Sequence, residues 1–516
     1  MQKLLSILLS LPLAAVASEP LTFTISPGSN SGKPCLQVAV AFEGSAKGIT
    51  YLSYQDNQFG EPNQMAFVEF PQQDPSVSVT KEPDSNRFVV HHQPGKRVRV
   101  LYEVLDLQDS STFFYQYCCY KPIIRDNYFH VQTGHLLASP EDYWEDPEAR
   151  EMLRLRWVNF PSDYVLHNSF GPGLSQTATL TNTEFSVAVF VGGDFRRHTF
   201  EVQGKPVYLL TRGQWSQFSD DTLVSLMQRT VEGHRAFWND FNDTIYSVTF
   251  LPINDAPWTE KSKSVSIGGS GLTNSFMSFA TNNPGISFDL IRYVWVHELM
   301  HHWIGVKIEN ADEERQYWFS EGFTEYFTLK NSLRYGLIST DGFLEGLNTF
   351  ASEHFSSPQR SQPNDSLNYE HFWNGGKEWE KLPYRRGCLY AFYLDNLIRT
   401  QSNGQQNLDQ FMRSVLAEMN TNPAQKLDHA FFLKMLRPYA GKASDKIFKQ
   451  YIERGKPINF RKSKLPDGLE VEVKDVTMRF GPSREIITST KVLKNIPVFR
   501  PKSGVSKETL REALLK

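Results

Sequence analysis

Short runs of hydrophobic residues broken by turn residues fill the first two hundred positions of the chain. Examples are C-L-Q-V-A-V-A-F, R-V-R-V-L-Y-E-V, F-S-V-A-V-F-V and P-V-Y-L-L-T, separated by stretches rich in Gly, Pro, Asn and Asp. Their length and the spacing of the turns are typical of the strands of an all-β sandwich. We therefore predict an N-terminal β domain over residues 18–215.

The pattern changes to a helical period near Ser219. Hydrophobic residues then recur at spacings of three and four, and two short strand patterns precede a further series of helices that continues to about Gly455. The last sixty residues again resemble strands and finish in a basic helical segment. We predict a multidomain α+β protein, whose later parts are an α+β domain over 216–335, a helical domain over 336–455 and an extension over 456–516.

A cluster of ionisable residues lies inside one helical pattern. Residues 289–305 read D-L-I-R-Y-V-W-V-H-E-L-M-H-H-W-I-G and contain His297, Glu298 and His301 as H-E-x-x-H. On a helix, two histidines four residues apart lie on one face, so both imidazoles can reach one ion. Glu298 lies about 100° further round the helix, where it can move a proton without being a ligand.

The limits of this helix follow from residues that favour its two ends. Asp289 is a suitable N-cap, and Gly305 fits just past the C-terminal end. The apolar stripe that we expect to face inward consists of Leu290, Val294, His297, His301 and Ile304.

A third ligand is needed, because hydrolytic zinc sites use three protein ligands and leave one position open. Residues 320–327 read S-E-G-F-T-E-Y-F, and Glu321, which opens this second helical pattern, is the candidate. Glu325 lies one turn further on the same face, where it could orient a ligating histidine. The alternative is a buried helix with two hydrogen-bonded histidines, and we prefer Zn²⁺ because both patterns occur together.

At these residues the chain resembles the gluzincin metallopeptidases, in which a downstream Glu completes the two-histidine site. The wording W-F-S-E-G-F-T-E-Y-F is most similar to the bacterial glycyl aminopeptidase family. The resemblance implies a thermolysin-like catalytic domain over residues 216–335, peptide substrates, and Glu298 as the group that moves the proton. It also implies that residues 456–516 take the place of a PDZ module, as a truncated PDZ-like remnant.

Residues 268–276 read G-G-S-G-L-T-N-S-F, where the resembled family has G-G-x-E-H-x-N-S and binds the substrate main chain on an edge strand. Gly271 and Leu272 replace Glu and His, so the carboxylate that would hold a substrate α-amine is missing. The candidate substrate-binding residues are Gly268, Gly269, Gly271, Asn274 and Ser275.

A further candidate lies in L-P-Y-R-R-G-C-L-Y-A-F-Y-L-D-N-L-I-R, residues 382–399, which resembles Y-x-K-G-A-L-x-A-x-x-L-D-x-x-I-R of the same family. Arg386 replaces the family Lys, and Gly387 is retained. The resemblance implies that the Tyr384 phenol donates a hydrogen bond to the oxyanion of the reaction. The alternative is a tyrosine at a helix start that packs on the core.

The amino terminus has the features of a secretory signal over residues 1–17, with Lys3 before an apolar run and A-V-A at its end. The run is too short to cross a bilayer, so we expect an exported protein, periplasmic or secreted, with no stable membrane insertion after removal of the signal. The net charge of −3 argues against nucleic acid as a partner.

The four cysteines form no C-x-x-C pair that would indicate a thiolate metal site. In an exported protein Cys35 could form a disulfide with Cys118 or Cys119, or these residues and Cys388 could all remain thiols. The sequence decides neither this pairing nor the oligomeric state.

Three functions remain compatible with the sequence. The first is a zinc aminopeptidase that acts on short peptides, and the second is an endopeptidase with the same chemistry. The third is a non-catalytic binding protein that contains zinc, which the intact Glu298 disfavours.

Overall fold

The computed structural model describes residues 19–53, 64–82, 85–107, 121–144, 146, 149–253, 265–480 and 489–516. The predicted signal peptide, and with it the cleavage point, lies outside these residues. So do Cys118 and Cys119. Within the described residues no helix has both the length and the apolar composition that crossing a membrane requires.

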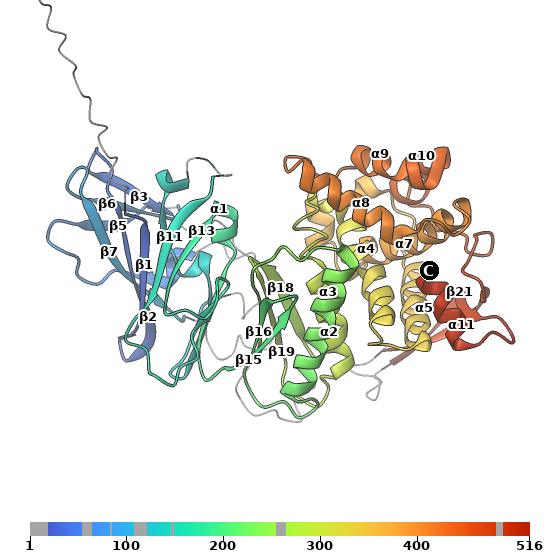
Figure 1. Ribbon diagram of the computed structural model, residues 1–516, viewed down its shortest axis with the longest axis horizontal. Helices are drawn as coiled ribbons and strands as arrows, with labels where there is room; N and C mark the ends of the chain where they lie inside the picture. Colours follow the sequence, from blue (N-terminus) through green and yellow to red (C-terminus); the bar gives the residue numbers. More distant parts are fainter. Residues whose placement is uncertain are drawn as a thin grey trace, which may run out of the picture. The chain divides into compact units, whose positions relative to one another are not determined.

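The chain divides into two compact units. The first contains residues 1–110 and 119–195, and the second contains 111–118 and 196–516. The first unit is built mainly from three sheets (Figure 1), which confirms the predicted N-terminal β domain as a fold class.

The largest sheet of the first unit contains six strands. In spatial order they are β13 (Ser175–Leu180), β11 (Glu151–Trp157), β1 (Leu21–Asn30), β2 (Lys33–Glu43), β7 (Arg97–Leu105) and β4 (Val68–Glu69). The second sheet contains β10 (Ser139–Pro140), β3 (Ile49–Ser53), β6 (Arg87–His91) and β5 (Ser78–Lys81). The third contains β12 (His167–Asn168), β14 (Val189–Gly193), β9 (Tyr128–Gln132) and β8 (Ile123–Ile124), and the short helix α1 spans Asn182–Ser186.

Alternate residues of these strands form the core of the first unit. Phe23, Val38, Val40 and Tyr102 are completely buried, as the two-residue period of a half-buried strand requires. Cys35 is a buried free thiol on β2. Burial, followed by the charge of Glu103, raises the pKa of this thiol to about 11.

The second unit begins with a five-stranded sheet. Its spatial order is β15 (Arg196–Val202), β16 (Lys205–Thr211), β17 (Tyr246–Pro252), β19 (Ser275–Ala280) and β18 (Ile267–Leu272). The sequence pattern predicts an N-terminal domain up to residue 215, whereas the structure pairs the first two of these strands with strands of the second unit. The pattern of residues 205–211 predicts a strand but does not identify its partner. That partner is β17, which pairs with β16 in parallel and follows helix α2 (Asp220–Trp238) in the sequence.

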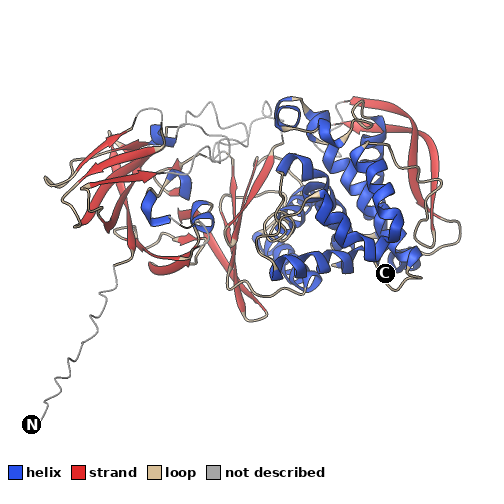
Figure 2. Ribbon diagram, turned by 90° about the horizontal axis from the view of Figure 1, so that it is seen from above, coloured by secondary structure: helices blue, strands red, loops and turns tan. Residues whose placement is uncertain are grey.

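Helices follow the sheet. They are α3 (Phe288–Met300), α4 (Glu313–Arg334), α5 (Thr340–Ser356), α6 (Lys377–Glu380), α7 (Leu382–Gln401), α8 (Leu408–Thr421), α9 (His429–Ala440) and α10 (Ser444–Phe448). Figure 2 shows these helices between the sheet and a C-terminal hairpin formed by β20 (Leu469–Phe480) and β21 (Ser489–Pro501). Helix α11 (Lys507–Leu515) ends the described chain.

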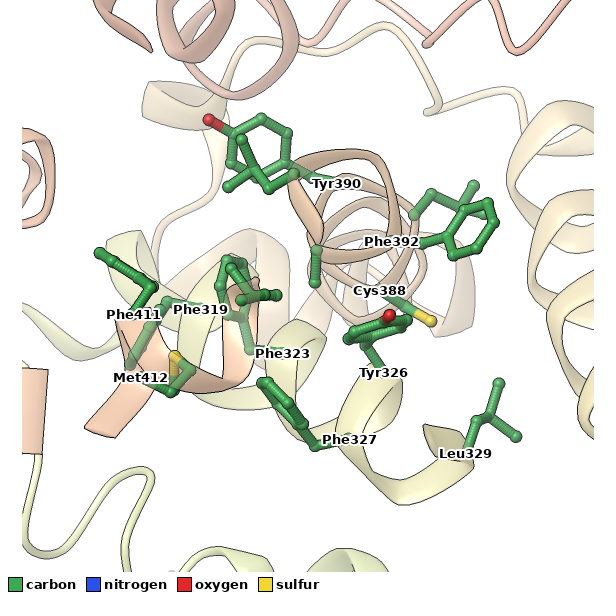
Figure 3. Packing of buried hydrophobic residues seen from close by; sticks show 14 of the residues in the cluster. Phe319, Phe323, Tyr326, Phe327, Leu329, Cys388, Tyr390, Phe392, Phe411 and Met412 are labelled. Carbon is green, nitrogen blue, oxygen red and sulfur yellow. The ribbon is translucent and has the colours of Figure 1, made fainter. Parts of the chain in front are cut away.

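Helices α4, α7 and α8 share an aromatic core. Figure 3 shows Phe323 and Phe327 of α4 in this core, Cys388 on the side of α7 that faces Tyr326, and Tyr390 on the other side of α7. A buried ionic cluster lies in the same region. The Lys330 Nζ atom, which is inaccessible to solvent, lies 2.8 Å from Asp395 Oδ2 and 2.7 Å from Asp409 Oδ1.

The C-terminal extension packs on this helical core. Asn348 of α5 donates to the carbonyl oxygen of Phe499 at 2.9 Å and accepts from its amide at 2.7 Å. Arg399 of α7 donates to the carbonyl oxygens of Ala513 and Leu514 at 2.7 and 3.1 Å. Within the described part of residues 456–516 there is one hairpin and one helix, and no further strand that a PDZ-like sheet would require.

Candidate active site

Helix α3 carries the H-E-x-x-H residues, but its ends differ from our expectation. The N-cap is Ser287, whose hydroxyl accepts a hydrogen bond from the amide of Leu290 at 3.2 Å. Asp289 lies in the first turn instead, and helical geometry ends at Met300 with His301 as the C-cap. Ser287 and Asp289 are both favourable N-cap residues, and the sequence does not show which of the two begins the helix. Gly305, at φ 114°, lies beyond the end of the helix.

The buried face of α3 agrees with the predicted stripe only in part, since His297 is buried there and Leu290 and Val294 pack at the edge of the core. Ile291, Trp295 and Leu299 pack on the sheet, and the indole N–H of Trp295 donates to Ser278 Oγ of β19 at 3.1 Å. Leu290 and Val294 are only half-buried. Because α3 is hydrophobic on several sides, its sequence fits two stripes equally well.

Helix α4 supplies Glu321 from its interior. The helix starts at Glu313, after Asp312 in the N-cap position, so the expectation that Glu321 opens the helix is wrong. The first two turns carry Glu313, Glu314 and Gln316 among aromatic residues, which obscured the helical pattern in the sequence. An interior position holds the Glu321 backbone rigidly opposite α3.

The structure brings His297, His301 and Glu321 together. His297 Nε2 lies 3.1 Å from His301 Nε2 and 3.4 Å from Glu321 Oε2, and His301 Nε2 lies 3.5 Å from the same carboxylate oxygen. Ligands about 2.0–2.2 Å from a tetrahedral zinc ion are about 3.3 Å apart. These three atoms therefore fit one Zn²⁺, and they leave a fourth position free.

Acceptor groups near the Nδ1 atoms of the two histidines orient the imidazole rings. His301 Nδ1 lies 2.9 Å from the carbonyl oxygen of Ile304, which accepts its proton and leaves Nε2 free to bind a metal. His297 Nδ1 lies 3.5 Å from Glu325 Oε2, where we expected an orienting carboxylate. The Tyr293 hydroxyl donates to the same oxygen of Glu325. Tyr293 lies one turn before His297 on α3, and no motif in the sequence marks it.

Electrostatics at these residues favour a bound cation. Burial would lower the pKa of His297, but Glu325 and Glu321 raise it well above its ordinary value. Burial would likewise lower the pKa of His301, and Glu321 raises it. Burial would raise the pKa of Glu321, yet the imidazoles of His301 and His297 hold it below its ordinary value. Without a metal, protons on the imidazoles balance the carboxylates.

Zinc binding is therefore expected to weaken as the pH falls. Zn²⁺ needs neutral imidazoles, and the raised pKa values of His297 and His301 mean that protons compete with it below those values. We expect the affinity to fall by about tenfold per pH unit for each protonated ligand. Zinc retained after dialysis between about pH 8 and about pH 5 measures this, and a retention that does not change with pH would contradict it.

Glu298 lies beside the ligands on α3. Burial raises the pKa of its carboxyl group, while His297 and His301 lower it, and the net change is upward. A carboxylate whose pKa is raised toward neutrality is a stronger proton acceptor.

Tyr384 lies in the first turn of α7 and faces the same residues. Its ring lies 6.4 Å from the His297 ring, at 15° to it, and Lys381 Nζ lies 4.4 Å from its centre. Burial, then the carboxylates of Glu321 and Glu298, raise the pKa of Tyr384 well above its ordinary value. The phenol thus stays protonated and can donate a hydrogen bond.

A contact between two glycines sets the separation of α4 and α7. A Cβ added to Gly387 would overlap the carbonyl oxygen of Trp318 and would lie 2.7 Å from the Cα of Gly322. A Cβ added to Gly322 would lie 2.8 Å from the carbonyl carbon of Gly387. Gly322 follows Glu321 directly, and Gly387 lies three residues after Tyr384, so this contact fixes both side chains relative to each other.

The glycine-rich stretch forms a hairpin of β18 and β19. Strand β18, with Gly268, Gly269 and Gly271, is the edge strand of the sheet and lies beside α3 (Figure 1). Gly269 is required by packing, because an added Cβ would overlap the ring of Phe276. A Cβ at Gly271 would meet no atom within 4 Å. The structure thus gives open space where the resembled family has its Glu.

Asn274 and Ser275 belong to the turn of this hairpin. Asn274 has φ 49°, and Ser275, the first residue of β19, donates from Oγ to the carbonyl oxygen of Thr273 at 2.9 Å. The left-handed backbone of Asn274 and the hydrogen bond of Ser275 stabilise the turn. The structure therefore gives them a local role, and their contact with a substrate stays a prediction.

Comparison with known proteins identifies the fold. An aminopeptidase N family protein from Idiomarina loihiensis is 16% identical with a TM-score of 0.70, and the likeness covers 88% of this chain and 79% of that one. An M1 zinc metallopeptidase from Deinococcus radiodurans is 16% identical with a TM-score of 0.50, over 86% of this chain and 95% of that one. A mutant of that enzyme bound to a Tyr-Ser-Ala substrate has a TM-score of 0.51 at 15% identity, over the same shares of the two chains.

In sequence, a leucine aminopeptidase 2 from Aspergillus terreus is 29% identical over 157 residues. The match covers 28% of this chain and 22% of that enzyme, so it spans about a fifth of the relative's length. No protein-family model matches the chain. The structural likenesses show that the chain has the fold of the M1 zinc metallopeptidases, which confirms the predicted gluzincin fold.

Proposed function

From this fold, we propose that the protein is a zinc-dependent aminopeptidase that hydrolyses short peptides. The proposal rests on one observation, the mutual distances of 3.1–3.5 Å among the imidazole nitrogens of His297 and His301 and a carboxylate oxygen of Glu321. A bound Zn²⁺ would supply Lewis acidity toward a peptide carbonyl and toward water. The non-catalytic alternative leaves the half-buried Glu298 and Tyr384 without a role.

Residues of the chain then have separate roles in the reaction. Glu298 accepts the proton of the attacking water and gives it to the leaving amine, which its raised pKa favours. Tyr384 donates a hydrogen bond to the oxygen that becomes negative in the transition state. Strand β18, at the sheet edge, offers its backbone to the substrate main chain.

Peptide substrates are supported by the Deinococcus radiodurans metallopeptidase, whose mutant binds Tyr-Ser-Ala. Removal of zinc by a chelator is expected to abolish hydrolysis, and added Zn²⁺ is expected to restore it. A purified chain without stoichiometric zinc that still hydrolysed peptides would overturn the proposal. Zinc without hydrolysis would favour the binding protein.

The second candidate is an endopeptidase with the same chemistry. It is favoured by Gly271, which leaves the substrate α-amine without the carboxylate of the resembled family. A pair of peptides that differ only in N-acetylation separates the two. An aminopeptidase is expected to cleave the acetylated peptide at least about 10²-fold more slowly, because the enzyme's amine-binding group is then left unpaired. Equal rates, with cleavage inside the peptide, would indicate the endopeptidase.

Tyr384→Phe tests the oxyanion donor. We expect kcat to fall by about 10²–10³-fold with KM little changed, because the hydrogen bond is made mainly in the transition state. Tyr393→Phe on the same helix is the matched control, since Tyr393 packs against Tyr451 and not against the metal ligands. An unchanged kcat in Tyr384→Phe would assign Tyr384 to packing alone.

Export from the cytoplasm is part of the proposal. Its support is the charged start, apolar run and A-V-A sequence of residues 1–17. Expression in a bacterial host is expected to yield a chain that begins at Ser18 in the exported fraction. A cytoplasmic chain that keeps Met1 would contradict this.

A further inference from the structure

A small cavity lies beside α7. Its walls come from α5, α7 and the π-helical turn Lys449–Glu453 with the residues after it. The space open to the centre of a water-sized sphere is about 10 Å³, enough for one water molecule or one small ion. The lining residues are His354, Arg386, Leu389, Tyr390, Tyr451, Lys456 and Ile458.

Three buried polar atoms of this lining have no hydrogen-bond partner among the residues that the structure describes. They are Arg386 Nε, His354 Nδ1 and the hydroxyl oxygen of Tyr390, and their residues are 4%, 4% and 0% exposed. Buried polar groups are nearly always paired, and a single unpaired one is costly. Three such atoms around one small space indicate that something polar occupies it.

The charge of Arg386 is also unbalanced. Its Nη2 atom donates to the carbonyl oxygen of Gln362 at 2.5 Å, and no carboxylate of the described residues lies within ion-pair distance. The neighbouring Arg385, equally buried, pairs with Glu353 at 3.0 Å and Glu378 at 2.9 Å. Burial lowers the pKa of Arg386 to about 10, so the guanidinium remains charged at neutral pH. A buried charge normally has a partner.

The other lining groups do not supply a negative charge. Burial, then the charges of Arg386 and Arg385, lower the pKa of His354 to about 3, so this imidazole is neutral. Lys456 is exposed and adds positive charge at the rim. A water molecule would satisfy the hydrogen bonds but would leave the charge of Arg386 unbalanced, whereas an anion satisfies both.

We propose that this cavity binds a single small inorganic anion, a halide such as chloride, held by Arg386, Tyr390 and His354. The small space favours a monatomic anion over the larger sulfate or carboxylate. Gly455, at φ 64°, lies close to this guanidinium: an added Cβ would overlap the carbonyl oxygen of Gln362 and lie 2.9 Å from Arg386 Nη2. The proposal does not depend on peptidase activity, because none of these residues touches the metal ligands.

Thermal unfolding of the full-length zinc-loaded protein tests the site. Chloride replaces gluconate stepwise at constant ionic strength. The midpoint temperature of unfolding is expected to rise to a plateau with chloride or bromide, and not to rise with sulfate. Tyr390→Phe removes one hydrogen-bond donor with little change of shape. It is expected to raise the dissociation constant for chloride by about tenfold. Tyr393→Phe makes the same change outside the cavity and is expected to leave the constant unchanged.

Two results would overturn the proposal. A midpoint that does not depend on chloride would mean that water fills the cavity. A chloride effect equal in the parent, Tyr390→Phe and Tyr393→Phe proteins would place the ion elsewhere, for instance at the zinc. Crystals soaked in bromide give an independent readout: an anomalous peak within hydrogen-bonding distance of Arg386 Nε supports the site, and none there refutes it.

Discussion

Glu298→Gln is expected to lower kcat by about 10²–10⁴-fold while zinc stays bound at one ion per chain. The amide keeps the size and shape of the carboxylate but cannot accept the proton of the attacking water. Because His297, His301 and Glu321 are untouched, metal binding is expected to survive. Metal analysis and steady-state kinetics on one preparation measure both.

Glu232→Gln on α2 is a suitable control, since it makes the same change on an exposed side chain that accepts a hydrogen bond from Gln228. Full activity in Glu298→Gln would remove Glu298 from the mechanism. Loss of zinc in that variant would show instead that the carboxylate is needed to hold the metal.

Gly387→Ala is expected to destabilise the protein by about 3 kcal/mol and to reduce activity at least tenfold. The new methyl group would overlap the Trp318 carbonyl oxygen, which is helix backbone and cannot rotate away. Helices α4 and α7 must then separate, and Tyr384 moves relative to Glu321. Urea unfolding and kinetics of the folded variant measure the two effects.

Gly342→Ala on α5 is the matched control, because its new methyl group would lie no closer than 3.3 Å to another residue. A stable Gly387→Ala variant with normal kinetics would show that the glycine contact does not position the site.

The metal-ligand cluster was predictable because short, local sequence motifs mark its residues. His297 and His301 are one helical turn apart, and Glu321 is marked by the short motif around it, so the structure needed only to bring two helices together. Tyr293 and Gly322 were not singled out, because their roles depend on partners far away in sequence, Glu325 and Gly387. No pattern within α3 or α4 alone reports those contacts.

The fold class was predictable for the same reason, and the boundaries were not. Periodicity identifies each strand, but strand pairing is a long-range property, so the sequence does not show that residues 196–211 pair within the second unit. The buried face of α3 was ambiguous because the helix is apolar on more than one side. Sequence reasoning also gave no sign of the Arg386 cavity, which assembles residues from three separate elements.

The packing of α11 on α7 makes the carboxyl end of the chain a structural component. Arg399 links the last described helix to Asp395, with Arg399 Nη2 2.6 Å from Asp395 Oδ2, and thereby to the buried ammonium of Lys330. Proteolytic trimming of α11, or a tag that disturbs it, would uncover Leu510 and Leu514 and leave a guanidinium without its carbonyl acceptors. Affinity handles for purification therefore belong elsewhere on the molecule.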